Sequence, residues 1–227
     1  MASRELCSTV RELRLQRRDG LPFVQRAGQY IVLRPGEVGP DGESRPYSIS
    51  SPPNDVGELC VCVQHTDSPF AARIAALEVG SEILAEDPSG RFILPDELDD
   101  DLLLVATGTG ISPFRAMAAR LVAHAARRSV VLLFGARRAE GLLYDEDWRE
   151  LAEEVEGFTY MPTLSAPHEG EWGGAVGRVQ ATLPAALEGL RLDATRAYLC
   201  GFPQMLEEMR TLLADAGLAP EKIISKQ

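Results

Sequence analysis

Residues 102–121 read LLLVATGTGISPFRAMAARL, and their order of apolar run, turn and helix indicates an α/β fold for the second half of the chain. It opens with a fully apolar run, which is typical of a strand buried on both faces of a parallel sheet. A turn follows, and a helix begins at Pro113, where the missing N–H of proline has no consequence. Glycines permit a tight turn and close approach of a phosphate, and the N-terminus of a helix offers free N–H groups. We expect nucleotide binding by the turn residues Thr107, Gly108, Thr109, Gly110, Ile111 and Pro113.

The alternative for this turn is an ordinary strand-to-helix connection, which often contains a single glycine. Two glycines with two threonines directly after the first apolar strand favour phosphate binding. The third glycine of the common dinucleotide fingerprint is absent, and Pro113 stands in its place. The turn therefore indicates a nucleotide without specifying which one.

The remainder of the second half repeats the pattern of strand, turn and helix. The expected buried strands are 102–106, 130–134, 158–162, 197–200 and 222–225. Helices are expected near 113–127, 145–155, 178–188 and 203–216. Because alternating strands and helices form a parallel sheet covered on both faces, residues 98–227 are predicted to be a Rossmann-like α/β domain with five parallel strands.

The first half has a different rhythm, with short strands separated by Gly and Pro. The expected strands are 9–16, 29–35, 45–50, 58–64, 81–86 and 91–94. One helix begins at Pro69, with Phe70, Ile74 and Leu77 at helical spacing. Residues 1–97 are therefore predicted to form a small antiparallel β-barrel or sandwich, and we favour the barrel.

Composition excludes several classes of protein. The 227 residues are 45% hydrophobic and 25% charged, which is typical of a folded globular chain. With 34 acidic and 23 basic residues the net charge is −11, which argues against nucleic-acid binding. There is no apolar run of the ~20 residues that span a bilayer, and the N-terminus lacks the apolar core of a secretion signal. We expect a cytoplasmic protein without a membrane span.

The four cysteines, Cys7, Cys60, Cys62 and Cys200, do not have the spacing of a zinc or iron–sulfur site, so no metal is expected.

Lysine is scarce in the sequence, which fits either a GC-rich genome or a high-salt habitat.

Three segments together resemble the ferredoxin–NADP reductase family of flavoproteins, in its bacterial form. They are RPYSISSP at 45–52, GTGISPF at 108–114 and CGFPQM at 200–205. They occur in the order of the family, and the resemblance covers almost the whole chain. It implies that residues 1–97 bind FAD and that residues 98–227 bind NAD(P).

The first of these segments is similar to the flavin-binding strand of the family, which implies FAD contacts for Arg45, Pro46, Tyr47 and Ser48. In a strand, Arg45 and Tyr47 share one face, and Pro46 and Ser48 share the other. A guanidinium suits a pyrophosphate, and a Tyr ring can stack on the isoalloxazine or bond a ribityl hydroxyl. The hydroxyl of Ser48 can bond the N5/O4 edge of the flavin. The alternative is an ordinary barrel strand.

A second flavin element, DSPFAAR at 67–73, resembles the turn that holds the FAD phosphates in the bacterial subgroup. Alanines stand at 71 and 72 where hydroxyl residues are usual, so fewer side-chain contacts are expected. Helix N–H groups and a guanidinium can still bind phosphate. The FAD contacts implied here are Ser68, Pro69, Phe70, Ala71, Ala72 and Arg73.

The choice of nucleotide depends on Arg137 and Arg138, which follow the strand 130–134. At this place in the fold, arginines can accept the 2′-phosphate of NADP, whereas an acidic residue favours NAD. The alternative is a solvated surface pair. Many relatives carry Ser-Arg after the third strand, and here the segment is Ser165–Ala166. We therefore expect NADP(H) to be favoured over NAD(H).

The resemblance implies a reaction in which hydride passes between NADP(H) and FAD, and single electrons pass to a ferredoxin, a flavodoxin or another separate redox carrier. Ser48 and Cys200 are the catalytic candidates, and Cys200, Gly201 and Met205 are also expected to contact the cofactors. Cys200 can instead be a small buried residue. The alternatives are a reductase component of an oxygenase or other multicomponent system, and a non-catalytic flavin-fold regulatory subunit. We expect a monomer.

The acidity of the chain bears on its partner. Residues 1–97 hold 15 acidic and 10 basic residues, and residues 98–227 hold 19 and 13, so both halves are acidic. Such a protein repels an acidic carrier unless a basic patch exists, high salt screens the repulsion, or the acceptor is not strongly acidic. The candidates for such a patch are Arg11, Arg14, Arg17, Arg18 and Arg73.

Overall fold

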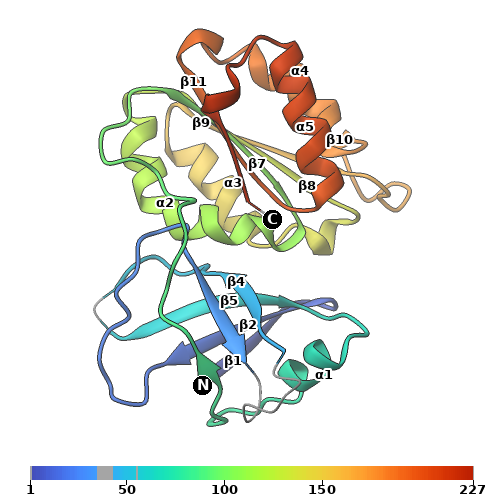
Figure 1. Ribbon diagram of the computed structural model, residues 1–227. Coiled ribbons are helices and arrows are strands. Elements are labelled where there is room, and N and C mark those ends of the chain that lie inside the picture. The colour runs from blue at the N-terminus through green and yellow to red at the C-terminus, as the bar shows by residue number, and fades with distance from the viewer. Residues whose placement is uncertain (1, 35–42, 55, 227) are drawn as a thin grey trace. The chain divides into compact units, whose positions relative to one another are not determined.

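The computed structural model describes residues 2–34, 43–54 and 56–226 (Figure 1). Pro35, the last residue of the strand expected at 29–35, lies outside these ranges. The chain divides into two compact units, which we describe separately. The first contains Met1–Leu94 and Ser112–Met117, and the second contains Pro95–Ile111 and Ala118–Gln227.

The first unit is built from two antiparallel sheets of three strands each. One sheet has the order β1-β2-β5, with bounds β1 Ala2–Cys7, β2 Val10–Gln16 and β5 Glu58–Gln64. The other has the order β4-β3-β6, with bounds β4 Arg45–Ser48, β3 Tyr30–Arg34 and β6 Leu84–Ala85. A bridge between Ile49 and Val61 connects them, and the short helix α1, Pro69–Ala75, lies beside β5. The prediction of an N-terminal antiparallel β region is confirmed.

The core of this unit explains its strand pattern. Alternate residues of β2, β3 and β5 point inward and meet side chains of α1. The fully enclosed members are Leu13, Ile31, Leu33, Ile49, Leu59, Val61, Phe70 and Ile74.

The strands of this half differ from the prediction in two places, one strand that was missed and one that does not form. The strand β1 was not expected, because its charged sequence lacks an apolar alternation, and it forms by pairing with the edge of β2. Residues 91–94 do not form a strand, although Phe92 and Leu94 are buried.

The second unit is a parallel sheet of six strands in the order β10-β9-β8-β7-β11-β12. The bounds are β7 Asp101–Thr107, β8 Val130–Ala136, β9 Phe158–Leu164, β10 Ala175–Val176, β11 Thr195–Cys200 and β12 Ile223–Lys226. The predicted Rossmann-like α/β fold is confirmed, but the count of five strands was too low by one. The extra strand, β10, has two exposed residues, and so short a segment carries no periodic signal.

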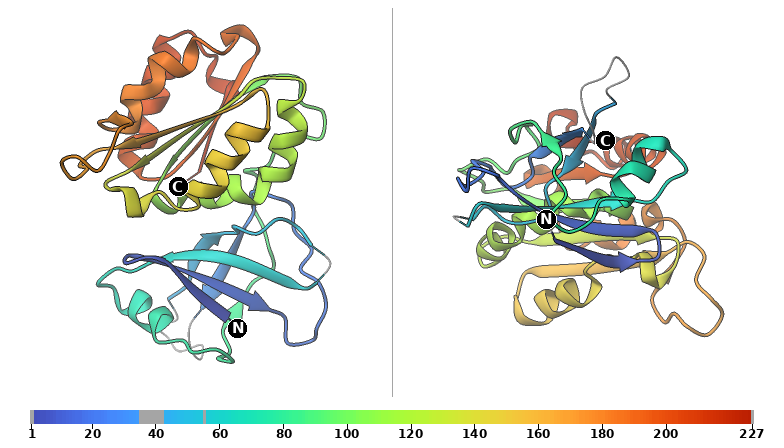
Figure 2. Two further views of the ribbon diagram at one scale, coloured as in Figure 1. Left: turned by 180° about the vertical axis from the view of Figure 1, so that it is seen from behind. Right: turned by 90° about the horizontal axis from the view of Figure 1, so that it is seen from below.

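Helices cover both faces of this sheet (Figures 1 and 2). The helices α2 Ser112–Ala125 and α3 Asp145–Glu154 lie on one side, and α4 Leu183–Leu187 and α5 Pro203–Asp215 lie on the other. The helix expected at 178–188 begins as a 3-10 turn, Val179–Thr182, and continues as α4. Pro184 lies in the first turn of α4, where a proline is tolerated. No helix in the described ranges is long and apolar enough to cross a membrane.

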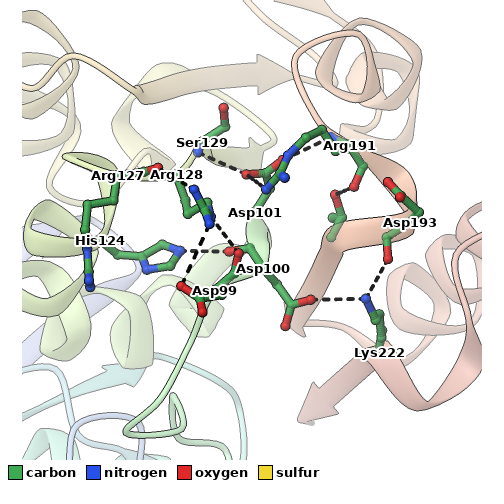
Figure 3. A network of polar contacts seen from close by, with 11 residues as sticks. Asp99, Asp100, Asp101, His124, Arg127, Arg128, Ser129, Arg191, Asp193 and Lys222 are labelled. Atoms are coloured by element: carbon green, nitrogen blue, oxygen red, sulfur yellow. Dashed lines mark hydrogen bonds and ion pairs between the residues drawn. The ribbon is translucent and has the colours of Figure 1, made fainter.

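A network of charged residues lies along the amino-terminal edge of the parallel sheet (Figure 3). Asp101, at the start of β7, accepts hydrogen bonds from the Arg191 side chain at 3.0 and 3.1 Å and from the Ser129 N–H at 3.3 Å. Asp100 accepts hydrogen bonds from Lys222 and Arg196 at 3.1 and 3.0 Å. Burial raises the pKa of both carboxyl groups, but these hydrogen bonds outweigh burial and hold each pKa below its ordinary value. The network connects the starts of four strands, β7, β8, β11 and β12, at the edge of the sheet opposite to the glycine turn.

Candidate functional site

The glycine turn after β7 forms one 3-10 turn, Gly108–Ile111, before α2 begins. Gly108 has a φ of +55°, a left-handed value that glycine adopts without strain. At Gly110 a side chain is excluded for another reason, because a Cβ there would lie 2.2 Å from the carbonyl oxygen of Cys200. The second glycine is therefore required by packing inside the protein, whatever its role toward a ligand.

A hydrogen bond connects the turn after β11 to Thr107, the last residue of β7. The backbone N–H of Phe202 donates a hydrogen bond to Thr107 Oγ1 at 3.3 Å. Gly201 has a φ of +153°, and a Cβ at this position would lie 2.1 Å from the same Thr107 Oγ1. Two motifs that are about 90 residues apart in sequence are thus brought side by side at the carboxyl ends of neighbouring parallel strands, where open α/β sheets bind ligands.

Five of the residues expected to contact a cofactor here are buried, namely Gly110, Ile111, Pro113, Cys200 and Met205. Ile111 and Met205 lie in the interior, Met205 within the hydrophobic core of the second unit. Cys200 is 3% exposed, and burial raises the pKa of its thiol to about 12, so the thiol keeps its proton at neutral pH. Its neighbour across the register is Lys226 on β12, which was not anticipated; burial lowers the pKa of that ammonium to about 8.

In the first unit, the register of β4 with β3 determines the faces of the expected flavin strand. Tyr47 pairs with Ile31, and Arg45 with Leu33, so both side chains lie on the face of the core residues. Pro46 and Ser48 lie on the opposite face, as the period of two predicts.

An aromatic ring supports this strand. The guanidinium carbon of Arg45 is 4.8 Å from the centroid of the Phe70 ring. The ring of Tyr47 stacks against the same Phe70 with centroids 6.2 Å apart and an angle of 20°. Burial raises the pKa of Tyr47 to about 12, so Tyr47 is a phenol and a hydrogen-bond donor at neutral pH.

Glu43, which sequence reasoning missed, lies between two of the expected phosphate-binding arginines. Its Oε1 accepts a hydrogen bond from Arg45 Nε at 3.1 Å, and its Oε2 is 4.0 Å from Arg73. The two guanidinium groups therefore converge on one carboxylate. The two-residue spacing of Glu43 and Arg45 was an available signal for the first contact; the contact with Arg73 has no local signal.

The helix α1 presents fewer side chains to a ligand than the resemblance of residues 67–73 implied. Ser68 caps the helix, because its Oγ accepts a hydrogen bond from the Ala71 N–H at 3.1 Å. Phe70 and Ala71 are buried, whereas Pro69, Ala72 and Arg73 are exposed. Arg73 is accordingly the cationic side chain that this turn presents.

The arginine pair follows β8. Arg137 and Arg138 are exposed, and neither guanidinium has a hydrogen bond or ion pair with any residue in the described part of the chain. The Arg137 carbonyl accepts a hydrogen bond from the Ala166 N–H at 2.9 Å. Arg137 thus lies beside the segment Ser165–Ala166. Because β8, β7 and β11 are neighbours in the sheet, the arginine pair, the glycine turn and the Cys200 turn occupy three consecutive strand ends.

Comparison with known proteins agrees with this arrangement. Residues 104–211 match the model of the oxidoreductase NAD-binding domain family. The chain is 33% identical over 221 residues to ferredoxin–NADP reductase B of Sorangium cellulosum (strain So ce56), covering 93% of this chain and 88% of that protein. It therefore belongs to the ferredoxin–NADP reductase-like family of FAD- and NAD(P)-binding oxidoreductases.

Oxygenase reductases are similar as well. The reductase component of phenol 2-monooxygenase from Pseudomonas sp. (strain CF600) is 31% identical over 226 residues, which cover 98% of this chain but 62% of that protein. Among solved structures, the Amycolatopsis cytochrome P450 reductase GcoB superposes with a TM-score of 0.85 at 26% identity, over 100% of this chain and 67% of that one. The chain thus spans about two thirds of the length of these two proteins.

Proposed function

We propose that this protein is an FAD-dependent oxidoreductase that exchanges hydride with NADP(H) and single electrons with a separate ferredoxin or flavodoxin. The observation that carries the proposal is the unpaired arginine pair, Arg137 and Arg138, one strand away from the glycine turn. Several other arginines of the second unit have carboxylate partners, such as Arg178 with Glu208 and Arg191 with Asp101. Two free guanidinium groups at the carboxyl edge of the sheet suit a dianionic phosphate.

The preference for NADP(H) rests on this pair alone. Ala166 stands where many relatives have an arginine, and it lies beside Arg137 in the structure. Arg137 and Arg138 can therefore take over the contact with the 2′-phosphate that Ala166 cannot make.

The donor set of the first unit fits FAD. Arg45 and Arg73 converge on Glu43, and a diphosphate in place of that carboxylate would satisfy both guanidinium groups. The Tyr47 phenol offers a donor and a ring, and the half-buried Ser48 hydroxyl is available on the other face of β4. When bound, FAD supplies hydride acceptance at N5 and release of electrons one at a time.

The second candidate is a reductase component of an oxygenase or other multicomponent system. A specific observation favours it. Each arginine of the expected docking patch has a carboxylate partner in the first unit, which neutralises the patch. The pairs are Arg11–Glu5, Arg14–Glu58, Arg17–Asp19, Arg18–Glu82 and Arg73–Glu43. An acceptor that is not strongly acidic suits this surface better than an acidic ferredoxin does.

The test is anaerobic reduction of the FAD-loaded protein by NADPH and by NADH, followed by rapid absorbance measurement. The wild type is expected to favour NADPH. The double variant Arg137→Ala/Arg138→Ala should lose about tenfold or more in the apparent affinity for NADPH and little for NADH. The control is Arg127→Ala, which removes an exposed arginine near the opposite edge of the sheet. Equal use of both nucleotides by the wild type would contradict the NADP(H) proposal.

Two further outcomes test the class of protein and the acceptor. A protein that stays colourless after incubation with FAD contradicts the flavoprotein proposal. Absence of turnover with either nucleotide and ferricyanide supports the non-catalytic subunit instead. Comparison of a ferredoxin, a flavodoxin and an oxygenase component as acceptors then separates the two candidate functions.

A further inference from the structure

The side chain of Phe202 has an unusual environment. It is 53% exposed, whereas the other thirteen aromatic side chains, all of them in the described ranges, are buried or half-buried. An exposed phenylalanine ring lacks the stabilisation that burial of its apolar surface would provide. We therefore expect an exposed ring at the ligand-binding edge of a parallel sheet to contact an apolar part of a ligand.

The ring is held in a defined place. The Phe202 N–H is fixed to Thr107 Oγ1, and Pro203 begins α5 directly after it. The edge of the ring lies over Gly108, because a Cβ at Gly108 would be 3.6 and 3.7 Å from the Cε2 and Cζ atoms of Phe202. The ring is thus an apolar wall beside the glycine turn.

The order of the strands indicates which part of a dinucleotide meets this wall. Adjacent strands are about 4.8 Å apart, so the strand ends of β8, β7 and β11 follow one another across about 10 Å. On the proposed function, the 2′-phosphate binds at Arg137 and Arg138 on β8, and the pyrophosphate binds at the glycine turn on β7. The nicotinamide then lies at the end of β11, where Phe202 is.

We infer that the Phe202 ring is a stacking wall for the nicotinamide and favours its oxidised form; this rests on the proposed function. The face of a phenyl ring carries partial negative charge, so it attracts a cation. The oxidised nicotinamide is a cationic pyridinium, whereas the reduced ring is neutral. Phe202 therefore stabilises bound NADP⁺ more than bound NADPH.

The experiment is calorimetric titration of the oxidised FAD-loaded protein with three ligands. NADP⁺ carries the cationic ring, tetrahydro-NADPH carries a neutral ring that transfers no hydride, and 2′-phospho-ADP-ribose lacks the ring. The variant Phe202→Leu keeps apolar volume but removes the π face, and Phe202→Tyr restores it. Leu212→Ala, on the same helix, is the control for loss of an exposed apolar side chain.

We expect Phe202→Leu to weaken NADP⁺ binding about fivefold and tetrahydro-NADPH binding about twofold or less. Binding of 2′-phospho-ADP-ribose should be unchanged, and Phe202→Tyr should bind all three ligands like the wild type. Unchanged or tighter NADP⁺ binding by Phe202→Leu overturns the inference, and so does an equal loss for NADP⁺ and 2′-phospho-ADP-ribose. If the wild type binds none of the three ligands, the proposed function fails, and the inference fails with it.

Discussion

The carboxylate of Glu43 forms an ion pair with Arg45, whose guanidinium carbon lies 4.8 Å from the centroid of the Phe70 ring. The same carboxylate reaches Arg73 on α1. One acidic side chain thus occupies the position between two cations where, on the proposed function, the FAD diphosphate binds. The arrangement makes Glu43 a competitor of that diphosphate.

Replacement of this carboxylate should therefore strengthen FAD binding. The variant Glu43→Gln removes a negative charge that repels the phosphates. Because exposed ion pairs of this kind contribute up to about 1 kcal/mol, the variant should bind FAD about two- to fivefold more tightly. Affinity is measured by titrating the apoprotein with FAD and following flavin fluorescence. Glu82→Gln, which breaks the exposed pair with Arg18 in the same unit, is the control and should leave FAD affinity unchanged. Weaker FAD binding by Glu43→Gln would show that Glu43 supports the site.

The network at the amino-terminal edge of the sheet should dominate the stability of the second unit. Asp101 is buried and bonded to Arg191 and to the Ser129 N–H, so Asp101→Asn should lower the free energy of unfolding by about 2 kcal/mol. Urea denaturation followed by circular dichroism measures the change. The neighbouring Asp99 has a side chain that is 92% exposed, and Asp99→Asn should change stability by about 0.5 kcal/mol or less. Similar effects of the two substitutions would refute a special role for the buried carboxylate.

The same network predicts loss of stability in acid. In the folded protein, Asp100 and Asp101 have pKa values below the ordinary value, so the ionised forms stabilise folding. This contribution is complete above the unfolded-state pKa of about 3.9 and is lost as the pH falls through the lower folded-state pKa. The difference in melting temperature between the wild type and Asp101→Asn should shrink as the pH is lowered from about 6 to about 3. A difference that stays constant over this range would exclude the carboxyl group as its source.

The charge of the surface predicts the response of electron transfer to salt. The chain has a net charge of −11, and the arginines expected to attract an acidic carrier are paired with carboxylates. With an acidic ferredoxin as acceptor, the second-order rate should rise as NaCl increases from about 20 to about 200 mM, because salt screens the repulsion. Stopped-flow measurement with ferricyanide as a small-molecule acceptor serves as a comparison. A rate that falls with salt would reveal an attractive docking surface.

Local patterns in the sequence were sufficient for the architecture. The apolar run 102–106 and the alternation of β2, β3 and β5 determine which faces are buried, and burial of those faces determines the two kinds of sheet. The turn 107–111 was recognisable because its residues are consecutive in the chain. The two-residue strand β10 escaped prediction, since pairing with β9 defines it rather than any pattern of its own.

The fold class, the two kinds of sheet and the motifs that carry the family resemblance could be predicted from the sequence, because each depends on residues a few positions apart. The contacts of individual side chains became visible only in the folded chain. The tertiary structure showed that Gly110 is required by the Cys200 carbonyl, that Thr107 holds the Phe202 turn, and that Arg137 and Arg138 are free while Arg73 is paired with Glu43. Most of these contacts join residues far apart along the chain, so they form only when strands from distant segments lie side by side. The absence of a partner for a side chain among the described residues likewise depends on which segments the fold brings near it.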